Sequence, residues 1–153
     1  MIKISVMMLG LLMVSYAAGS RAGEADAILG EWNTEENKSK VEIYRCENKF
    51  CGRITWLKEP NFTPDNDQPD MIGKPKVDNR NPDKSKHMTP LLGLTFLNGF
   101  VYAGDNEWEG GTVYDPENGK TYKCVMSLGD AKTLNVRGYI GIPIIGRTTT
   151  WVR

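Results

Sequence analysis

Hydrophobic and polar residues alternate with a period of two in several short runs after residue 30. The period is clearest at Tyr122, Cys124, Met126 and Leu128, and it returns in residues 134–140. This alternation is typical of β-strands that bury one face. No periodic helical segment lies beyond the N-terminal residues, so we expect a nearly all-β protein. Strands are expected around Trp32 and over residues 40–45, 52–57, 94–102, 112–114, 120–128, 133–140 and 147–152.

Tight turns separate most of these runs. Residues 115–119 read Asp-Pro-Glu-Asn-Gly, which places Pro where φ near −65° is needed and Asn-Gly where φ is positive. Gly129-Asp130 makes a second short connection. Consecutive hairpins favour a meander, and closing the meander into a barrel removes its exposed edges. We therefore predict an all-β fold, an antiparallel meander barrel of about eight strands with one long loop.

Two of the three cysteines flank a turn between predicted strands. If Cys46 and Cys51 face each other, Val41 lies opposite Trp56 and Ile43 opposite Ile54. That register places apolar residues on one face, as a half-buried sheet requires. An oxidising compartment favours a Cys46–Cys51 disulfide, and the alternative is two unpaired thiols. Cys124 is expected to point into the core, where its thiol is inert packing. The predicted barrel interior consists of Val41, Ile43, Ile54, Trp56, Tyr122, Met126, Leu134 and Val136.

A long polar segment, residues 58–92, interrupts the strands. Loops of this length are uncommon in compact domains and are usually functional or disordered, so it is a candidate lid across one barrel opening. Within it, Asp78 and Asn81 either pin the loop or contact a ligand. Trp108, set among polar residues, is expected at the barrel mouth, where it would cap a ligand. The apolar turn Ile142–Ile145 is a candidate contact for the lid, a protein partner or a membrane.

The N-terminal residues have the three parts of a secretory signal. Lys3 precedes an apolar stretch over residues 4–14, and small residues follow it. The stretch is shorter than the roughly 20 residues that span a bilayer. We expect a signal peptide over residues 1–19, with cleavage after Ala17, Gly19 or Ala22, and a single barrel domain over residues 20–153. No transmembrane span is expected in the mature chain.

Composition and the distribution of reactive side chains limit the function. The chain has 19 Lys and Arg and 19 Asp and Glu, a balance that argues against nucleic-acid binding. His87 is the only histidine, and it lies in the polar segment without a nucleophile nearby in sequence. The acidic residues 65–70 lack the Gly and the terminal Glu of a calcium loop. We therefore expect no catalytic residues, no metal and no cofactor.

The chain contains, in order, the runs G-E-W, V-E-I-Y-R-C, C-G-R-I-T-W-L-K-E-P, the D-x-x-N-P-D of residues 78–83, P-L-L-G-L, W-E-G-G-T-V-Y-D-P-E-N-G-K-T-Y, L-N-V-R-G-Y-I-G and G-R-T-T-T-W-V-R. Together these runs resemble one bacterial family, the domain of unknown function 2147. The resemblance covers residues 30–153 and implies an exported protein with a lipocalin-like, calycin-type barrel and no settled activity. In lipocalins the Trp of G-x-W closes one end of the barrel and an Arg of the last strand packs across it. This implies structural roles for Gly30 and Trp32, with Arg147 and Arg153 both candidates for the Arg.

Three hypotheses for function follow. The first is a periplasmic or secreted bacterial protein that binds a small, mostly apolar ligand, a small molecule or a lipid, inside the barrel. The alternative is a non-enzymatic interaction protein of the cell envelope, with the barrel as scaffold and residues 58–92 or Ile142–Ile145 meeting another protein. The third is an enzyme that uses Asp78, His87 or Arg53 at the loop mouth.

Overall fold

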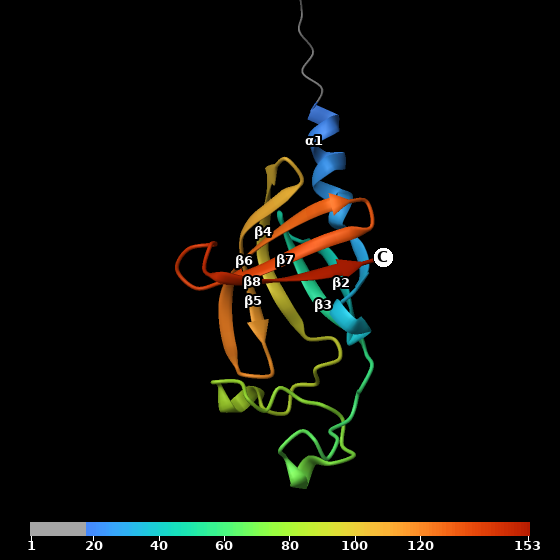
Figure 1. The fold of residues 1–153 in the computed structure, drawn as a ribbon, viewed down its shortest axis with the longest axis vertical. Coiled ribbons are helices and arrows are strands. Elements are labelled where there is room, and N and C mark those ends of the chain that lie inside the picture. The colour runs from blue at the N-terminus through green and yellow to red at the C-terminus, as the bar shows by residue number, and fades with distance from the viewer. Residues whose placement is uncertain (1–17) are drawn as a thin grey trace, which may run out of the picture.

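The computed structural model describes residues 18–153, and the part of the predicted signal peptide over residues 1–17 lies outside the described residues. A short helix, α1 (Ala18–Ala25), and a 3₁₀ turn, η1 (Asp26–Ile28), lead into an eight-stranded antiparallel barrel (Figure 1). Each strand pairs with the next, and β1 pairs with β8 to close the barrel. The predicted all-β meander barrel is confirmed. Its strands are β1 (Gly30–Asn33), β2 (Ser39–Cys46), β3 (Lys49–Leu57), β4 (Thr95–Gly104), β5 (Glu107–Asp115), β6 (Lys120–Asp130), β7 (Thr133–Tyr139) and β8 (Gly146–Val152).

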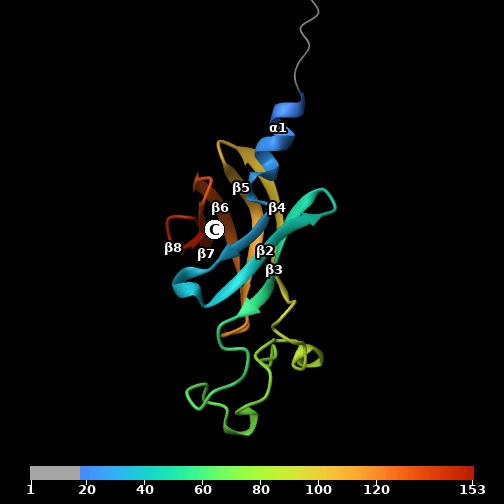
Figure 2. The ribbon, with the colours of Figure 1, turned by 90° about the vertical axis from the view of Figure 1, so that its right-hand side faces the viewer.

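The two ends of the barrel differ. Helix α1 lies at one end, together with the β2–β3, β4–β5 and β6–β7 turns, and we call this the closed end (Figures 1 and 2). The opposite, mouth end carries residues 58–94, which we call the mouth loop (Figures 1 and 2). The β7–β8 turn, residues 140–145, joins the strand ends opposite the β6–β7 turn, and we count it with the mouth end, although it projects sideways from the barrel (Figure 1). Three 3₁₀ turns lie there: η2 (Glu35–Asn37), η3 (Pro69–Met71) and η4 (Lys84–Lys86). Among the described residues, no helix is both long enough and apolar enough to span a membrane.

The β2–β3 hairpin contains the predicted disulfide but not the predicted register. Cys46 and Cys51 are bonded, with their Cα atoms 5.8 Å apart. Cys46 nevertheless lies opposite Lys49, so the turn has two residues, Glu47 with φ 56° and Asn48. Two-residue turns with positive φ match the twist of antiparallel strands, and the disulfide crosses the hairpin diagonally. The predicted register is wrong by an even number of residues, so most side chains keep their expected face.

Trp56 is the exception in this hairpin. Val41 lies opposite Ile54, and Lys40 lies opposite Trp56, so Thr55 is the extra residue of a bulge in β3. A bulge changes the face on which the following side chain lies. Trp56 is accordingly 44% exposed, and its predicted place in the barrel interior is wrong.

Strand β5 is longer than its sequence pattern indicates. The sequence pattern predicts a strand over residues 112–114 only, whereas β5 starts at Glu107. Its first half reads Glu-Trp-Glu-Gly-Gly, which has little apolar alternation. Asp105 and Asn106, with φ 52° and 59°, form the preceding turn, as Asn and Asp do in two-residue hairpin turns. Cross-strand pairing with β4 and β6 therefore extends the strand beyond its own pattern.

Candidate functional site

The closed end is sealed by a tryptophan and an arginine. The buried Trp32 indole donates from Nε1 to the Ile28 carbonyl at 2.8 Å. The Arg153 guanidinium lies 4.1 Å from the centre of the Trp32 ring and donates to the carbonyls of Leu29 and Ala27 at 2.9 and 2.8 Å. The arrangement combines a cation–π contact with charge-assisted hydrogen bonds. Arg153 is thus the arginine that packs on the G-x-W tryptophan, while Arg147 is exposed.

Trp108 also belongs to the closed end, and its predicted place at the mouth is wrong. Its ring is fully buried, 5.1 Å from the Tyr102 ring centre, and Nε1 donates to the Ala25 carbonyl at 3.1 Å. The polar residues around it in sequence form the β4–β5 turn and the outer face of β5. Trp108 itself points inward and contacts Ala25, the last residue of α1. It cannot cap a ligand at the opposite end.

Large side chains fill the interior of the barrel along its axis. A Cβ built on Gly111 would lie 2.5 Å from the Phe100 ring, and one built on Gly52 would lie 2.8 Å from Leu97 Cδ1. Phe100 and Leu97 are fully buried. The two glycines therefore leave the space that these side chains occupy. Such close packing is typical of a protein interior and not of an open ligand cavity.

Six of the eight predicted interior residues lie in this packed core. A cavity that admits water would expose the side chains lining it, yet these six are at most 7% exposed. Tyr122 is half-buried nearer the mouth, where its hydroxyl accepts a hydrogen bond from Asn118 Nδ2 at 3.0 Å. The buried Cys124 thiol points inward as expected, and burial raises its pKa to about 12. The six residues are Val41, Ile43, Ile54, Met126, Leu134 and Val136.

The mouth loop is anchored to the barrel through a buried carboxylate. Asp78 accepts hydrogen bonds from the Tyr114 hydroxyl and from Asn81 Nδ2, both at 2.6 Å, and its own N–H donates to the Thr89 carbonyl at 2.8 Å. Burial, together with the bond to the Asp78 carboxylate, raises the pKa of Tyr114. His87 Nε2 lies 2.7 Å from the Asn81 carbonyl oxygen and donates a hydrogen bond to it, since a carbonyl can only accept. This geometry fits loop pinning, the first of the two roles considered for Asp78 and Asn81.

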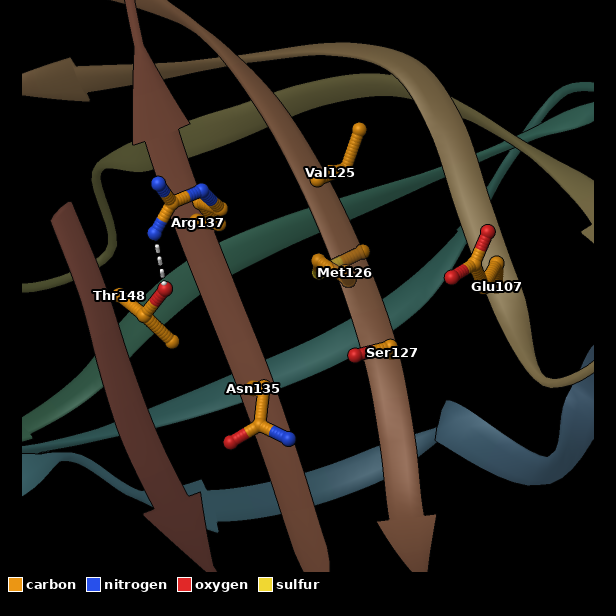
Figure 3. A pocket seen from close by; sticks show the side chains of 7 residues that line it. All are labelled: Glu107, Val125, Met126, Ser127, Asn135, Arg137 and Thr148. Atoms are coloured by element: carbon orange, nitrogen blue, oxygen red, sulfur yellow. Dashed lines mark hydrogen bonds between the residues drawn. The ribbon is translucent and has the colours of Figure 1, made fainter. Parts of the chain in front are cut away.

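A shallow depression of about 310 Å³ lies between strands β5 to β8 (Figure 3). Arg137 crosses one side of it and donates from Nη1 to the Thr148 hydroxyl at 2.7 Å. The depression is open to solvent, unlike the enclosed clefts of most small-molecule sites. Among the described residues, no group of three or more His, Cys, Asp or Glu side chains is placed to hold a metal ion. The depression is lined by Glu107, Val125, Met126, Ser127, Asn135, Arg137 and Thr148.

The β7–β8 turn is the most apolar exposed feature of the mouth end. We call residues 140–145 the isoleucine tip. The side chains of Ile140, Ile142, Ile144 and Ile145 are 71%, 56%, 80% and 66% exposed. In Figure 1 the tip is the red loop that projects sideways from the barrel. Arg137 holds it from below, donating from Nε to the Pro143 carbonyl at 2.6 Å and from Nη2 to the Ile144 carbonyl at 3.2 Å.

The chain matches a known family in sequence and a solved structure in fold. Residues 30–153 match the family model "Uncharacterized protein conserved in bacteria (DUF2147)". Among solved structures, the chain is similar to protein HP1028 from the human pathogen Helicobacter pylori, which is described as belonging to the lipocalin family. The identity is 22%, the TM-score is 0.68, and the match covers 82% of each chain. At this identity the likeness shows a lipocalin-like fold. No curated protein sequence matches the chain.

Proposed function

The chain belongs to the DUF2147 family of uncharacterized bacterial proteins, and we propose that it is an exported, non-enzymatic interaction protein whose lipocalin-like barrel is a rigid scaffold. Its contacts with other envelope components are made at the mouth end, chiefly through the isoleucine tip. The predicted signal peptide and the Cys46–Cys51 disulfide support a location outside the reducing cytosol.

One observation carries this proposal: apolar side chains fill the barrel, while four isoleucines are left in solvent. Phe100 and Leu97 occupy the axis against Gly111 and Gly52. An exposed apolar cluster of this kind usually marks a surface for protein or membrane contact. The side chains that an enzyme at the mouth needs are engaged otherwise, since His87 contacts a backbone carbonyl and Arg53 Nε donates to Glu42 at 2.8 Å.

Photocrosslinking in the living host tests the proposal. A photoreactive residue replaces Ile144 in the tip, and the matched control replaces Val101, which is 49% exposed on β4. Position 144 is expected to crosslink to an envelope component, protein or lipid, at far higher yield than position 101. Equal yields from two exported and folded variants would contradict the proposal.

A second candidate function is the binding of a small apolar ligand in the part of the barrel interior that lies nearest the mouth end. Val113 and Tyr122 pair there and are half-buried instead of buried, and Gly138 beside them has no side chain. Native mass spectrometry of protein purified from its own host tests this function. A lipid or small molecule retained at one per chain supports it, and a bare protein mass argues against it.

A further inference from the structure

The isoleucine tip has the composition of a surface that enters an apolar medium. Four of its six residues are isoleucines that are more than half exposed. A single exposed apolar residue needs no explanation, whereas a contiguous cluster does. The tip is also convex, because it ends a hairpin that projects from the barrel (Figure 1). A convex apolar tip inserts into a surface and does not enclose a ligand.

Most of the backbone hydrogen-bonding groups of the tip have partners within the hairpin. The Arg137 guanidinium donates hydrogen bonds to the carbonyls of Pro143 and Ile144. The Ile145 N–H donates to the Ile142 carbonyl at 3.1 Å, and the Ile142 N–H donates to the Ile140 carbonyl at 3.0 Å. Pro143 has no N–H to satisfy. Water would satisfy these groups without help, but in lipid each unpaired backbone group is costly.

The charged residues of the β7–β8 hairpin itself are all cations. Residues 133–153 contain three arginines and no Asp or Glu, although the whole chain is balanced. Arg153 lies at the closed end, so Arg137 and Arg147 are the cations of the hairpin that lie near the tip. Arg147, two residues beyond the tip, has a side chain that is 83% exposed and forms an exposed ion pair with Glu35 at 3.6 Å, an interaction that contributes little in water. Cations beside an apolar insertion are attracted to anionic lipid headgroups. Tyr139, at the base of the tip, is a residue type enriched at membrane interfaces.

We propose that the isoleucine tip inserts into the interfacial layer of a phospholipid bilayer that contains anionic headgroups, with Arg147 lying at the level of the phosphates. This inference rests on the proposed function and names the component that the tip contacts. A lipid surface fits better than a protein groove or a second copy of the chain. The tip is convex, most of its backbone is already paired, and the exposed Arg147 beside it matches a negative surface. Insertion by one hairpin turn is shallow and reversible.

Vesicle binding tests the inference. Protein is recovered after export, with removal of the signal checked by mass, and is mixed with vesicles of phosphatidylglycerol and phosphatidylethanolamine in equal parts. Replacing Ile144 and Ile145 with Ser is expected to lower the partition coefficient about tenfold or more. The matched control replaces Met88 and Leu92, two exposed apolar residues of the mouth loop, and is expected to change it less than about twofold.

Two further readouts separate insertion from adhesion. In the variant Ile144→Trp, the fluorescence emission of the new tryptophan is expected to shift to the blue when vesicles are added. Brominated lipid chains are expected to quench this fluorescence. Arg147→Gln is expected to weaken binding to anionic vesicles about fivefold and to leave the weak binding to phosphatidylcholine vesicles unchanged. Added salt is expected to have the same selective effect.

Three outcomes would overturn the lipid assignment. One is equal loss of binding in the tip and control variants. Another is a concentration-dependent dimer that the tip variant abolishes, with no vesicle binding. The third is crosslinking from position 144 to a protein but not to lipid, together with no measurable binding of the chain to vesicles. In the third case the proposed function stands and the lipid assignment fails, whereas a tip that contacts nothing in the host removes both.

Discussion

Adding one methyl group to the barrel interior, Gly111→Ala, is expected to destabilise the protein. The new Cβ would lie 2.5 Å from three carbons of the Phe100 ring, whereas carbon atoms in contact prefer about 3.5–4.0 Å. The ring must therefore move by about 1 Å, and since Phe100 is fully buried there is no free space beside it. Overpacking of this kind costs about 1–3 kcal/mol, or roughly 4–12 °C in Tm for a domain of this size.

Urea unfolding followed by tryptophan fluorescence measures the effect, with unchanged m values showing that the denatured state is unaltered. Gly129→Ala in β6 is the matched control, since its new Cβ would meet nothing closer than 3.8 Å. It is expected to be neutral or slightly stabilising, by less than about 1 kcal/mol. Phe100→Leu combined with Gly111→Ala is expected to recover part of the loss, because neighbouring substitutions are not additive.

The outcome also bears on function. If Gly111→Ala and Gly129→Ala are equally stable, the interior has unused space at the level of Phe100. The packing argument then fails, and the small-ligand hypothesis regains a cavity in the middle of the barrel. A clear loss of stability in Gly111→Ala alone leaves the mouth end as the place where this protein makes its contacts.

Three more predictions follow from the described contacts. Arg153→Ala is expected to lower the free energy of unfolding by about 2 kcal/mol, since three carbonyls lose a charged donor, while Arg147→Ala changes it by less than about 0.5 kcal/mol; equal losses in urea titration would contradict the assignment. Burial raises the pKa of Cys124 from 9.0 to about 12, so the unfolded chain loses this proton first and stability falls between these pH values by up to roughly 1.4 kcal/mol per pH unit. The variant Cys124→Val loses this part of the slope, and identical pH profiles would refute the reasoning. Asp78→Asn is expected to release the mouth loop to limited proteolysis while the barrel stays intact, and a cleavage rate equal to that of the wild type would show that Asp78 is not the anchor.

Much of the fold could be predicted from short stretches of sequence. A period of two identifies a half-buried strand because alternate side chains point to opposite faces, whatever the strand pairs with. Turns such as residues 115–119 are recognisable because Pro, Asn and Gly have restricted or permissive backbone angles. The cysteine pair and the G-x-W sequence are also local features. These signals predicted the meander, the barrel and the disulfide.

The errors occurred where a side chain's environment depends on a partner far away in sequence. The two-residue turn at Glu47 and the bulge at Thr55 moved Trp56 to the outer face, and the spacing of the cysteines could not reveal either feature. Trp108 has polar neighbours in sequence, but α1 and the residues after it cover it in space. The choice of Arg153 over Arg147 likewise depended on where β8 ends relative to Trp32.

By itself, the sequence determined an all-β meander barrel, its turns, its disulfide and the apolar turn between the last two strands. Only the tertiary structure decided that Phe100 and Leu97 fill the barrel against two glycines, and that the isoleucines of the tip stay in solvent. The physical reason is that local backbone preference and alternation act within a few residues. Whether an inward side chain lines a cavity or fills it depends on volumes contributed by strands that meet only when the barrel closes.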